Sequence, residues 1–168
     1  GGPQPAGWFG NALLSRLPIL DVRQFSLVWP PRVYDGTEPS EPRSLTLARV
    51  EAVDGPMWVG STHLPRADGA DRVRALRRLL SVTSDLPPPW LVMGDFTMAA
   101  AEWHGDYPDV TVAPSVAAPS YPADDARECI DYCVASSGLH VDASVLDVAG
   151  SDHLPVLVRV ALSRPSSR

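Results

Sequence analysis

The pattern of apolar and polar residues in the first 64 positions predicts four strands, the last two joined in a hairpin. The run NALLSRLPIL (11–20) predicts a strand that ends in a proline turn. The segments RQFSLVW (23–29) and RSLTLARVEAV (43–53) alternate polar and apolar residues, as half-buried strands do. Asp54-Gly55 is a hairpin signal, and MWVGSTHL (57–64) supplies the returning strand.

A helix is predicted over residues 68–86. Val73, Leu76, Leu79 and Leu80 recur at helical spacing and form one apolar face. The arginines that lie largely off this face are Arg72, Arg74, Arg77 and Arg78. They can be read either as a phosphate-binding cluster or as an ordinary solvated face of the helix.

The remainder of the chain is rich in predicted strands. WLVMGDF (90–96) is typical of a buried strand, and residues 113–126 form a loop rich in proline and alanine. Further strands are predicted in 128–136, 141–148 and 155–162. Antiparallel hairpins combined with one strand–helix–strand unit indicate an α/β fold with a mixed sheet and helical cover. We expect one domain over residues 1–162 and a loose tail over 163–168.

Two hexapeptides, GSTHLP (60–65) and GSDHLP (150–155), agree at five of six positions. A tandem repeat would place both in the same structural setting. Instead, His63 ends a predicted strand and His153 precedes one, so the repeat interpretation fails. If those strands run antiparallel, both histidines lie at one edge, together with Asp95 at the end of its own strand. We therefore expect His63, Asp95, Asp152 and His153 to meet, although each alone is also compatible with a structural role.

Composition limits the classes of function. The chain has 168 residues, 45% of them hydrophobic, which suffices for one domain with a core. No apolar run reaches membrane-spanning length, which predicts a soluble protein and leaves cytoplasm and secretion both open. The net charge of −6 argues against broad binding to duplex DNA, but a nucleic-acid substrate at a local site stays possible. Cys129 and Cys133 are about 13 Å apart if they share a strand, so separate thiols are expected.

Five motifs in order, GNALLSRLPI, STHLP, GDFT, IDYCVAS and SDHLPVLV, resemble those of the endonuclease/exonuclease/phosphatase superfamily. The resemblance spans nearly the whole chain, and S-D-H-x-P is its most specific piece. It implies a DNase I-like two-sheet α/β sandwich with four layers, α/β/β/α. It also implies hydrolysis of phosphoester, usually phosphodiester, bonds with Mg²⁺ or Mn²⁺ as the cofactor.

The resemblance also assigns roles. Asp95 matches the residue that positions or activates the attacking water, and it is a candidate metal ligand together with Asp152. His153 matches the histidine at the scissile phosphate, and Asp131 the carboxylate that orients it. His63 matches a second histidine on the phosphate side. These residue types suit the chemistry, because Mg²⁺ prefers oxygen ligands and a carboxylate partner fixes the tautomer of a histidine.

Two further positions are candidates for phosphate binding. Asn11 is the only asparagine in the chain and belongs to the GNALLS motif. Thr97 stands where the family usually has asparagine after Gly-Asp-Phe, and it offers a hydroxyl in place of an amide.

The family pattern begins earlier than this chain, with a strand that carries an asparagine and a later Gln-Glu pair that supplies a principal metal ligand. The expected fold is therefore incomplete at its N-terminal side. Three interpretations stay open: the missing part is a lost segment or a second chain that pairs with this one; the chain is a catalytically impaired binding module; or another residue, such as Asp35 or Asp106, replaces the ligand.

Competing chemistries are less well supported by the sequence. A Zn²⁺ hydrolase built on the same histidines and aspartates lacks the usual His-x-x-x-His spacing. A nucleophile paired with His153, either Ser151 or Cys133, lacks a nucleophile-elbow motif. The chief alternative to a phosphoester hydrolase is a binding module without enzymatic activity.

Overall fold

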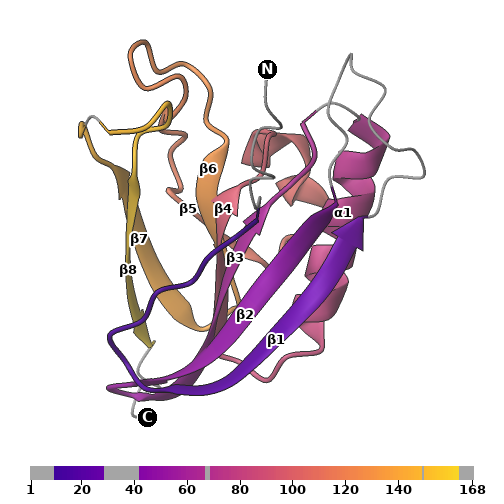
Figure 1. The fold of residues 1–168 in the computed structure, drawn as a ribbon, viewed down its shortest axis with the longest axis vertical. Helices are drawn as coiled ribbons and strands as arrows, with labels where there is room; N and C mark the ends of the chain where they lie inside the picture. Colours follow the sequence, from indigo (N-terminus) through magenta and orange to yellow (C-terminus); the bar gives the residue numbers. More distant parts are fainter. Residues whose placement is uncertain (1–9, 29–41, 67–68, 149, 163–168) are drawn as a thin grey trace, which may run out of the picture.

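The computed structural model describes residues 10–28, 42–66, 69–148 and 150–162. Its centre is a six-stranded mixed sheet with the strand order β1-β2-β3-β4-β6-β5, beside a two-stranded sheet formed by β7 and β8 (Figure 1). The elements are β1 (Ile19–Val28), β2 (Arg43–Ala52), β3 (Gly55–His63), α1 (Gly69–Ser84), β4 (Trp90–Asp95), the 3-10 turns η1 (Ala100–Glu102) and η2 (His104–Asp106), β5 (Thr111–Ala113), β6 (Asp131–Ala135), β7 (Leu139–Val145) and β8 (Val156–Leu162).

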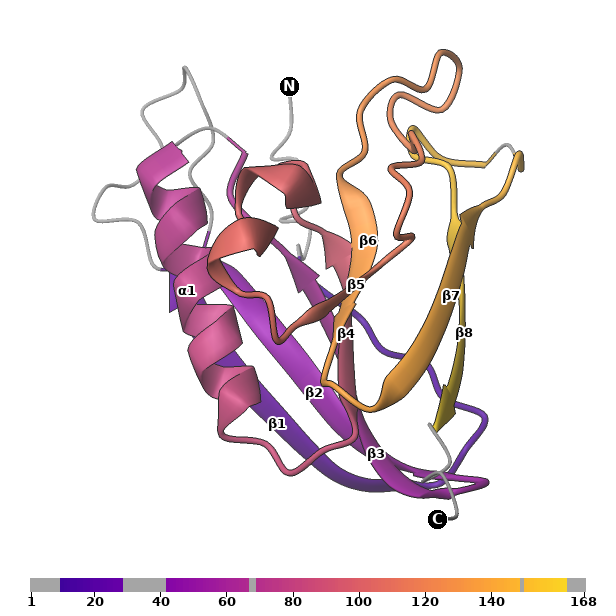
Figure 2. The ribbon, with the colours of Figure 1, turned by 180° about the vertical axis from the view of Figure 1, so that it is seen from behind.

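The large sheet separates two apolar cores. Helix α1 lies on one face and the β7–β8 sheet on the other (Figures 1 and 2). Side-chain alternation along β2 supplies both cores: Leu45 and Leu47 pack with α1, whereas Ala48 and Val50 pack on the side of Leu139 in β7. This arrangement confirms the predicted two-sheet α/β sandwich. A helical layer over the outer face of β7 and β8 is not present among the residues that the structure describes.

The predicted hairpin joins β2 to β3 as expected, with Ala52 paired to Gly55 around the turn. The predicted strand over 11–20 is wrong for most of its length, because β1 begins only at Ile19. Local hydrogen bonds replace the strand ladder in the preceding segment: Ser15 Oγ donates to Leu17 O, and Leu17 N donates back to Ser15 Oγ. Pro18, which follows, has no N–H to donate.

The strands of the two hexapeptides lie in different sheets. β3 lies inside the large sheet between β2 and β4, and β8 pairs with β7 in the second sheet. The histidine-bearing ends approach one another across the interface between the sheets. The convergence therefore depends on sheet packing and not on a shared strand ladder.

Gly94 allows β4 to approach β3 closely near the site. A Cβ atom at this position would lie 2.0 Å from the Thr62 carbonyl oxygen, which is backbone and cannot move aside independently. We expect Gly94→Ala to lower the free energy of unfolding by about 2 kcal/mol or more, because the strands must separate. Chemical denaturation measures this. Gly105→Ala is the matched control, since an added Cβ there meets nothing within 4 Å; equal losses in the two variants would contradict the close-approach argument.

Candidate active site

Three neighbouring strands each place a polar side chain at the same edge of the large sheet. His63 is the last residue of β3 and pairs in register with Asp95, the last residue of β4. Asp95 in turn pairs with Asp131, the first residue of β6. Backbone pairing continues past them, because Leu64 N donates to Asp95 O over 2.9 Å and Phe96 N donates to Ile130 O over 2.8 Å. The backbone beneath these side chains is thus held from both sides.

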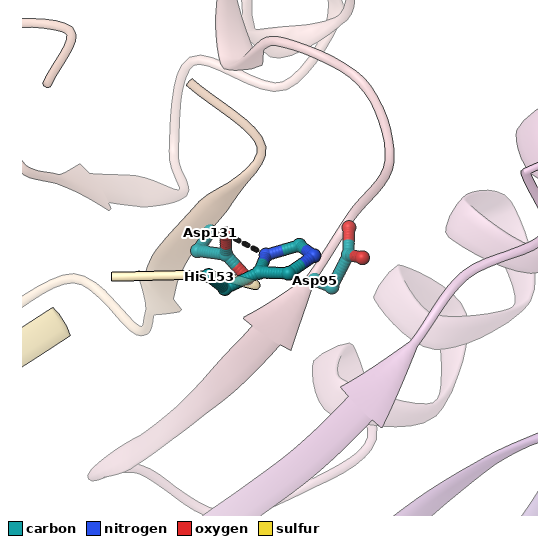
Figure 3. Close-up of side chains that lie close together, drawn as sticks. All are labelled: Asp95, Asp131 and His153. Carbon is teal, nitrogen blue, oxygen red and sulfur yellow. Dashed lines mark hydrogen bonds and ion pairs between the residues drawn. The ribbon is translucent and has the colours of Figure 1, made fainter. Parts of the chain in front are cut away.

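His153 reaches the same place from the segment that leads into β8. Its Nδ1 lies 2.7 Å from Asp131 Oδ2, and Figure 3 shows the imidazole ring lying between the Asp131 and Asp95 side chains. Nδ1 donates its proton to the Asp131 carboxylate, which leaves Nε2 available to contact a substrate. The Ser120 hydroxyl donates to the same Oδ2 atom over 2.6 Å. The orientation of His153 is therefore fixed by a carboxylate that is itself held.

The segment around Ser120 fixes the backbone of the His153 turn as well. Leu154 N donates to Ser120 O over 2.7 Å, and Ala123 N donates to Asp152 O over 2.8 Å. The Tyr121 ring packs against the His153 ring with centroids 4.6 Å apart. Sequence reasoning missed Ser120 and Tyr121, which lie in a loop that the composition marked only as rich in proline and alanine.

Burial shifts the titration of Asp95 and His63 in opposite senses. The carboxyl of Asp95 is largely buried, and this burial, followed by the negative charge of Asp131, raises its pKa to about 6. Burial, followed by the positive charge of Arg43, lowers the pKa of His63 to about 4. His63 Nε2 lies 3.3 Å from Asp95 Oδ2. At neutral pH the site therefore holds an ionised Asp95 beside a neutral His63.

Two arginines contribute positive charge to the site. Arg43, at the start of β2, is only 7% exposed, and its charge lowers the pKa of both His63 and Asp95. Arg66 follows the first hexapeptide, and its guanidinium lies over the Tyr121 ring at 5.2 Å, with Nη1 donating to the Tyr121 hydroxyl over 3.4 Å. Neither residue was among the sequence candidates.

Arg72, one of the four arginines of the predicted helix, binds backbone carbonyls near the site. Arg72 donates from Nε to Pro65 O over 3.1 Å and from Nη2 to Arg66 O over 2.6 Å. It thus anchors the turn after His63 to α1. Arg74 instead pairs with Asp71 on the helix itself.

Three predicted site residues lie outside the group formed by the strand ends and His153. Asp152 is exposed, and its Oδ1 accepts a hydrogen bond from Ser151 Oγ over 3.1 Å. Asn11 donates from Nδ2 to Ser44 O over 2.8 Å. Thr97 donates from its backbone N–H to Asp95 Oδ1 over 2.6 Å, and its hydroxyl lies 2.8 Å from Pro65 O.

The backbone of Thr97 has a φ of 54°. This left-handed conformation is unfavourable for a β-branched residue and much easier for asparagine, the residue that the resemblance leads us to expect here. The hydroxyl contact to Pro65 O and the backbone bond to Asp95 hold Thr97 in this conformation. Its side chain therefore braces the turn that follows Asp95.

Of the proposed replacement ligands, Asp106 lies exposed in η2 and Asp35 lies outside the described residues. The expectation of separate thiols holds, because Cys129 and Cys133 are both free. Burial raises the pKa of Cys133 to about 12, so this thiol is a poor nucleophile at neutral pH. The predicted tail, 163–168, also falls outside the described residues.

Within the described part of the chain, Asp95, Asp131 and His153 form a group that can hold a metal ion. Each offers one ligand atom, and these atoms all lie within 4.8 Å of one another. Both hydrogen bonds that the structure gives to the Asp131 carboxylate end on Oδ2, so Oδ1 is the oxygen that a cation would take. The two carboxylates of this group suit Mg²⁺ or Mn²⁺, which prefer oxygen ligands.

Two packed sheets with aspartates and histidines gathered where their ends meet define a DNase I-like protein. The sequence agrees with this assignment, because the model of the Endonuclease/Exonuclease/phosphatase family matches residues 2–153. The chain belongs to that family.

Solved structures show the same fold at low sequence identity. A mannosyl-6-phosphatase of Bacteroides thetaiotaomicron is 18% identical with a TM-score of 0.68, over 87% of this chain and 67% of that one. D. rerio TDP2 in complex with a single-strand DNA product is 13% identical (TM-score 0.63), over 87% of this chain and 69% of that one. The human Nocturnin catalytic domain with bound sulfate is 17% identical (TM-score 0.60), over 88% and 60%. No curated protein sequence matches the chain.

The chain thus spans about two thirds of the length of these structures. No helix in the described ranges combines the length and the apolar character needed to cross a membrane.

Proposed function

We propose that this protein hydrolyses phosphoester bonds with the help of a divalent cation. The observation that carries the proposal is the group of Asp95, Asp131 and His153 at the meeting point of the two sheets. Family membership supports the reaction class, and the structural relatives include a phosphatase and a protein bound to a DNA product. Phosphomonoesters and phosphodiesters, including nucleic-acid ends, are both candidate substrates.

The cation is expected to be Mg²⁺ or Mn²⁺, held by Asp95 and the Oδ1 atom of Asp131. Asp152, exposed beside His153, is a further candidate ligand that the family resemblance suggests. When bound, the cation would neutralise phosphate charge and polarise the ester. It would also relieve the repulsion by which Asp131 contributes to the raised pKa of Asp95.

The protein groups suit the two proton transfers of hydrolysis. Asp95 is ionised at neutral pH and can accept a proton from the water that attacks phosphorus. The new P–O bond forms as the bond to the alcohol oxygen breaks, and the alcohol leaves with a proton. In its imidazolium form, which carries a proton on each ring nitrogen, His153 can donate that proton from Nε2 while Nδ1 stays hydrogen-bonded to Asp131.

Positive charge for the substrate comes from a few nearby groups and not from a basic surface. Arg43 and Arg66 both act electrostatically on His63, and Arg66 also acts on Asp95. With a net charge of −6, we expect a local phosphate site and not extended binding along a duplex.

Removal of metal tests the proposed function. The purified chain should hydrolyse 4-nitrophenyl phosphate or bis(4-nitrophenyl) phosphate, monitored by release of nitrophenolate. EDTA should lower the rate by roughly tenfold or more, and added Mg²⁺ or Mn²⁺ in excess should restore it. The ester and the Asp95–Asp131 pair are all negatively charged and repel one another. A bound cation neutralises this charge, so that water can attack the ester.

A contaminating phosphatase is controlled for by Asp95→Asn, prepared in the same way, which should show no recovery with metal. An activity equal in wild type and variant would refute the assignment. Binding of a phosphate ester without turnover in Mg²⁺ and Mn²⁺ would also contradict a hydrolase, and it would favour the binding-module interpretation.

A further inference from the structure

A cavity adjoins the proposed catalytic group at Asp131. Its volume is about 330 Å³, and most of its wall is made of small apolar residues. Three consecutive alanines, Ala99–Ala101, come from the turn that follows the Asp95–Thr97 segment. Pro114, Ala117 and Ala118 come from the loop between β5 and β6. Small side chains on both sides leave room for a compact group.

The cavity and the proposed catalytic group share Asp131. This residue lines the cavity, while its Oδ2 atom accepts the hydrogen bond from His153. A phosphoester bound at Asp95 and His153 therefore has the apolar wall within reach of one of its substituents. The cavity adjoins the proposed site at Asp131, whereas Asp95 and His153 do not line it.

The polar groups of the wall are few and do not suit an anion. His104 lines the cavity, but its Nε2 is engaged with Val110 O at 2.7 Å. No arginine occurs among the described residues that line it, and the chain has no lysine. The Asp131 carboxylate at the boundary would repel a second phosphate. The wall therefore favours a neutral, largely apolar group over a polyphosphate or a nucleic-acid backbone.

We infer that this cavity binds the alcohol portion of the substrate, and that the substrate is a phosphoester of a compact apolar or aromatic alcohol. This inference rests on the proposed function, because it requires the phosphoryl group to bind at Asp95 and His153. Burial of an aromatic ring against the alanine wall provides the selectivity.

Binding of two phosphonates that are not hydrolysed tests the inference. Benzylphosphonate and methylphosphonate share the anionic head, and only the first has an aromatic group for the cavity. In Mn²⁺, isothermal titration calorimetry on the wild-type chain should give benzylphosphonate about tenfold tighter binding. Ala118→Phe should remove this advantage by filling the cavity, without changing the affinity for methylphosphonate.

Val116→Phe is the matched control, because Val116 lies in the same loop, is 79% exposed and does not line the cavity. It should retain the preference for benzylphosphonate. Ala101→Leu, from the opposite wall, gives an independent test if Ala118→Phe does not fold. Equal binding of the two phosphonates, or a preference that survives both filling variants, overturns the cavity assignment alone. Failure of both phosphonates to bind the wild type overturns the proposed function with it.

Discussion

Replacement of His153 by alanine is expected to lower kcat for a phosphoester by about 10²- to 10⁴-fold, the range typical of a lost proton donor. Among the proposed catalytic residues, His153 alone comes from the segment that leads into the second sheet. The others lie at strand ends of the large sheet. The His153 Nδ1 atom is held 2.7 Å from Asp131 Oδ2, so Nε2 has a fixed direction. Steady-state rates in saturating Mn²⁺ measure the loss.

Two further variants separate catalysis from folding. His140→Ala removes an exposed histidine on β7, outside the site, and should keep wild-type rates. Asp131→Asn retains the size of the orienting side chain but removes its charge, and it should lower kcat while the circular dichroism spectrum stays unchanged. It should also change the shape of the pH–rate profile, which a merely structural effect would not. A His153→Ala variant with more than roughly a tenth of wild-type activity would exclude the proposed donor role.

The sequence predicted much of this site because its motifs stand at strand ends. STHLP and GDFT each follow a strand with a clear apolar pattern, and neighbouring strand ends in a sheet lie close together. Alternation located β2, the hairpin signal located β3 and an apolar run located β4, each to within a few residues. What the pattern could not show is which strands pair, so the placement of β3 and β8 in different sheets was not predicted.

The supporting residues were missed because their signals are not local. Ser120 acts on Asp131, eleven positions further along the chain, and on the backbone of Leu154. Arg72 was visible only as part of a helical charge cluster, although it holds the carbonyls of Pro65 and Arg66. Such contacts depend on how a loop closes over the sheet, and no periodicity in the sequence encodes that closure. The sequence shows that Ser120 and Arg72 are polar residues, but it does not show which groups they bind.

The two neighbouring carboxylates that suit the site for catalysis also lower the stability of the folded state. Asp95 is largely buried, has Asp131 as its neighbour, and becomes ionised near neutral pH at an unfavourable position. His63 beside it stays neutral until about pH 4. A carboxylate buried next to another carboxylate is typical of functional sites, where stability is lower than the same fold would otherwise have.

We therefore expect Asp95→Asn to stabilise the metal-free protein at neutral pH while it abolishes hydrolysis. The pKa of Asp95 is about 6 in the fold against an ordinary value of 3.8. A raised carboxyl pKa means that the folded state holds the proton more tightly than the unfolded chain. Its favourable contribution is therefore complete below pH 4 and is lost as the pH rises through 6. The difference corresponds to about 3 kcal/mol.

The measurement is the free energy of unfolding in EDTA, by urea denaturation at several pH values between 4 and 7.5, for wild type and variant. The advantage of Asp95→Asn should grow by about 3 kcal/mol across this range, because the amide oxygen can still accept the Thr97 N–H while the buried charge is gone. His63 contributes with the opposite sign in both proteins, since its lowered pKa favours the fold as the pH rises from 4 to 6.5. Asp142→Asn, at an exposed position of β7, controls for the loss of one negative charge. A constant difference between wild type and Asp95→Asn over this range would show that the ionised carboxylate is not destabilised by its surroundings, and the electrostatic account of the site would fail with it.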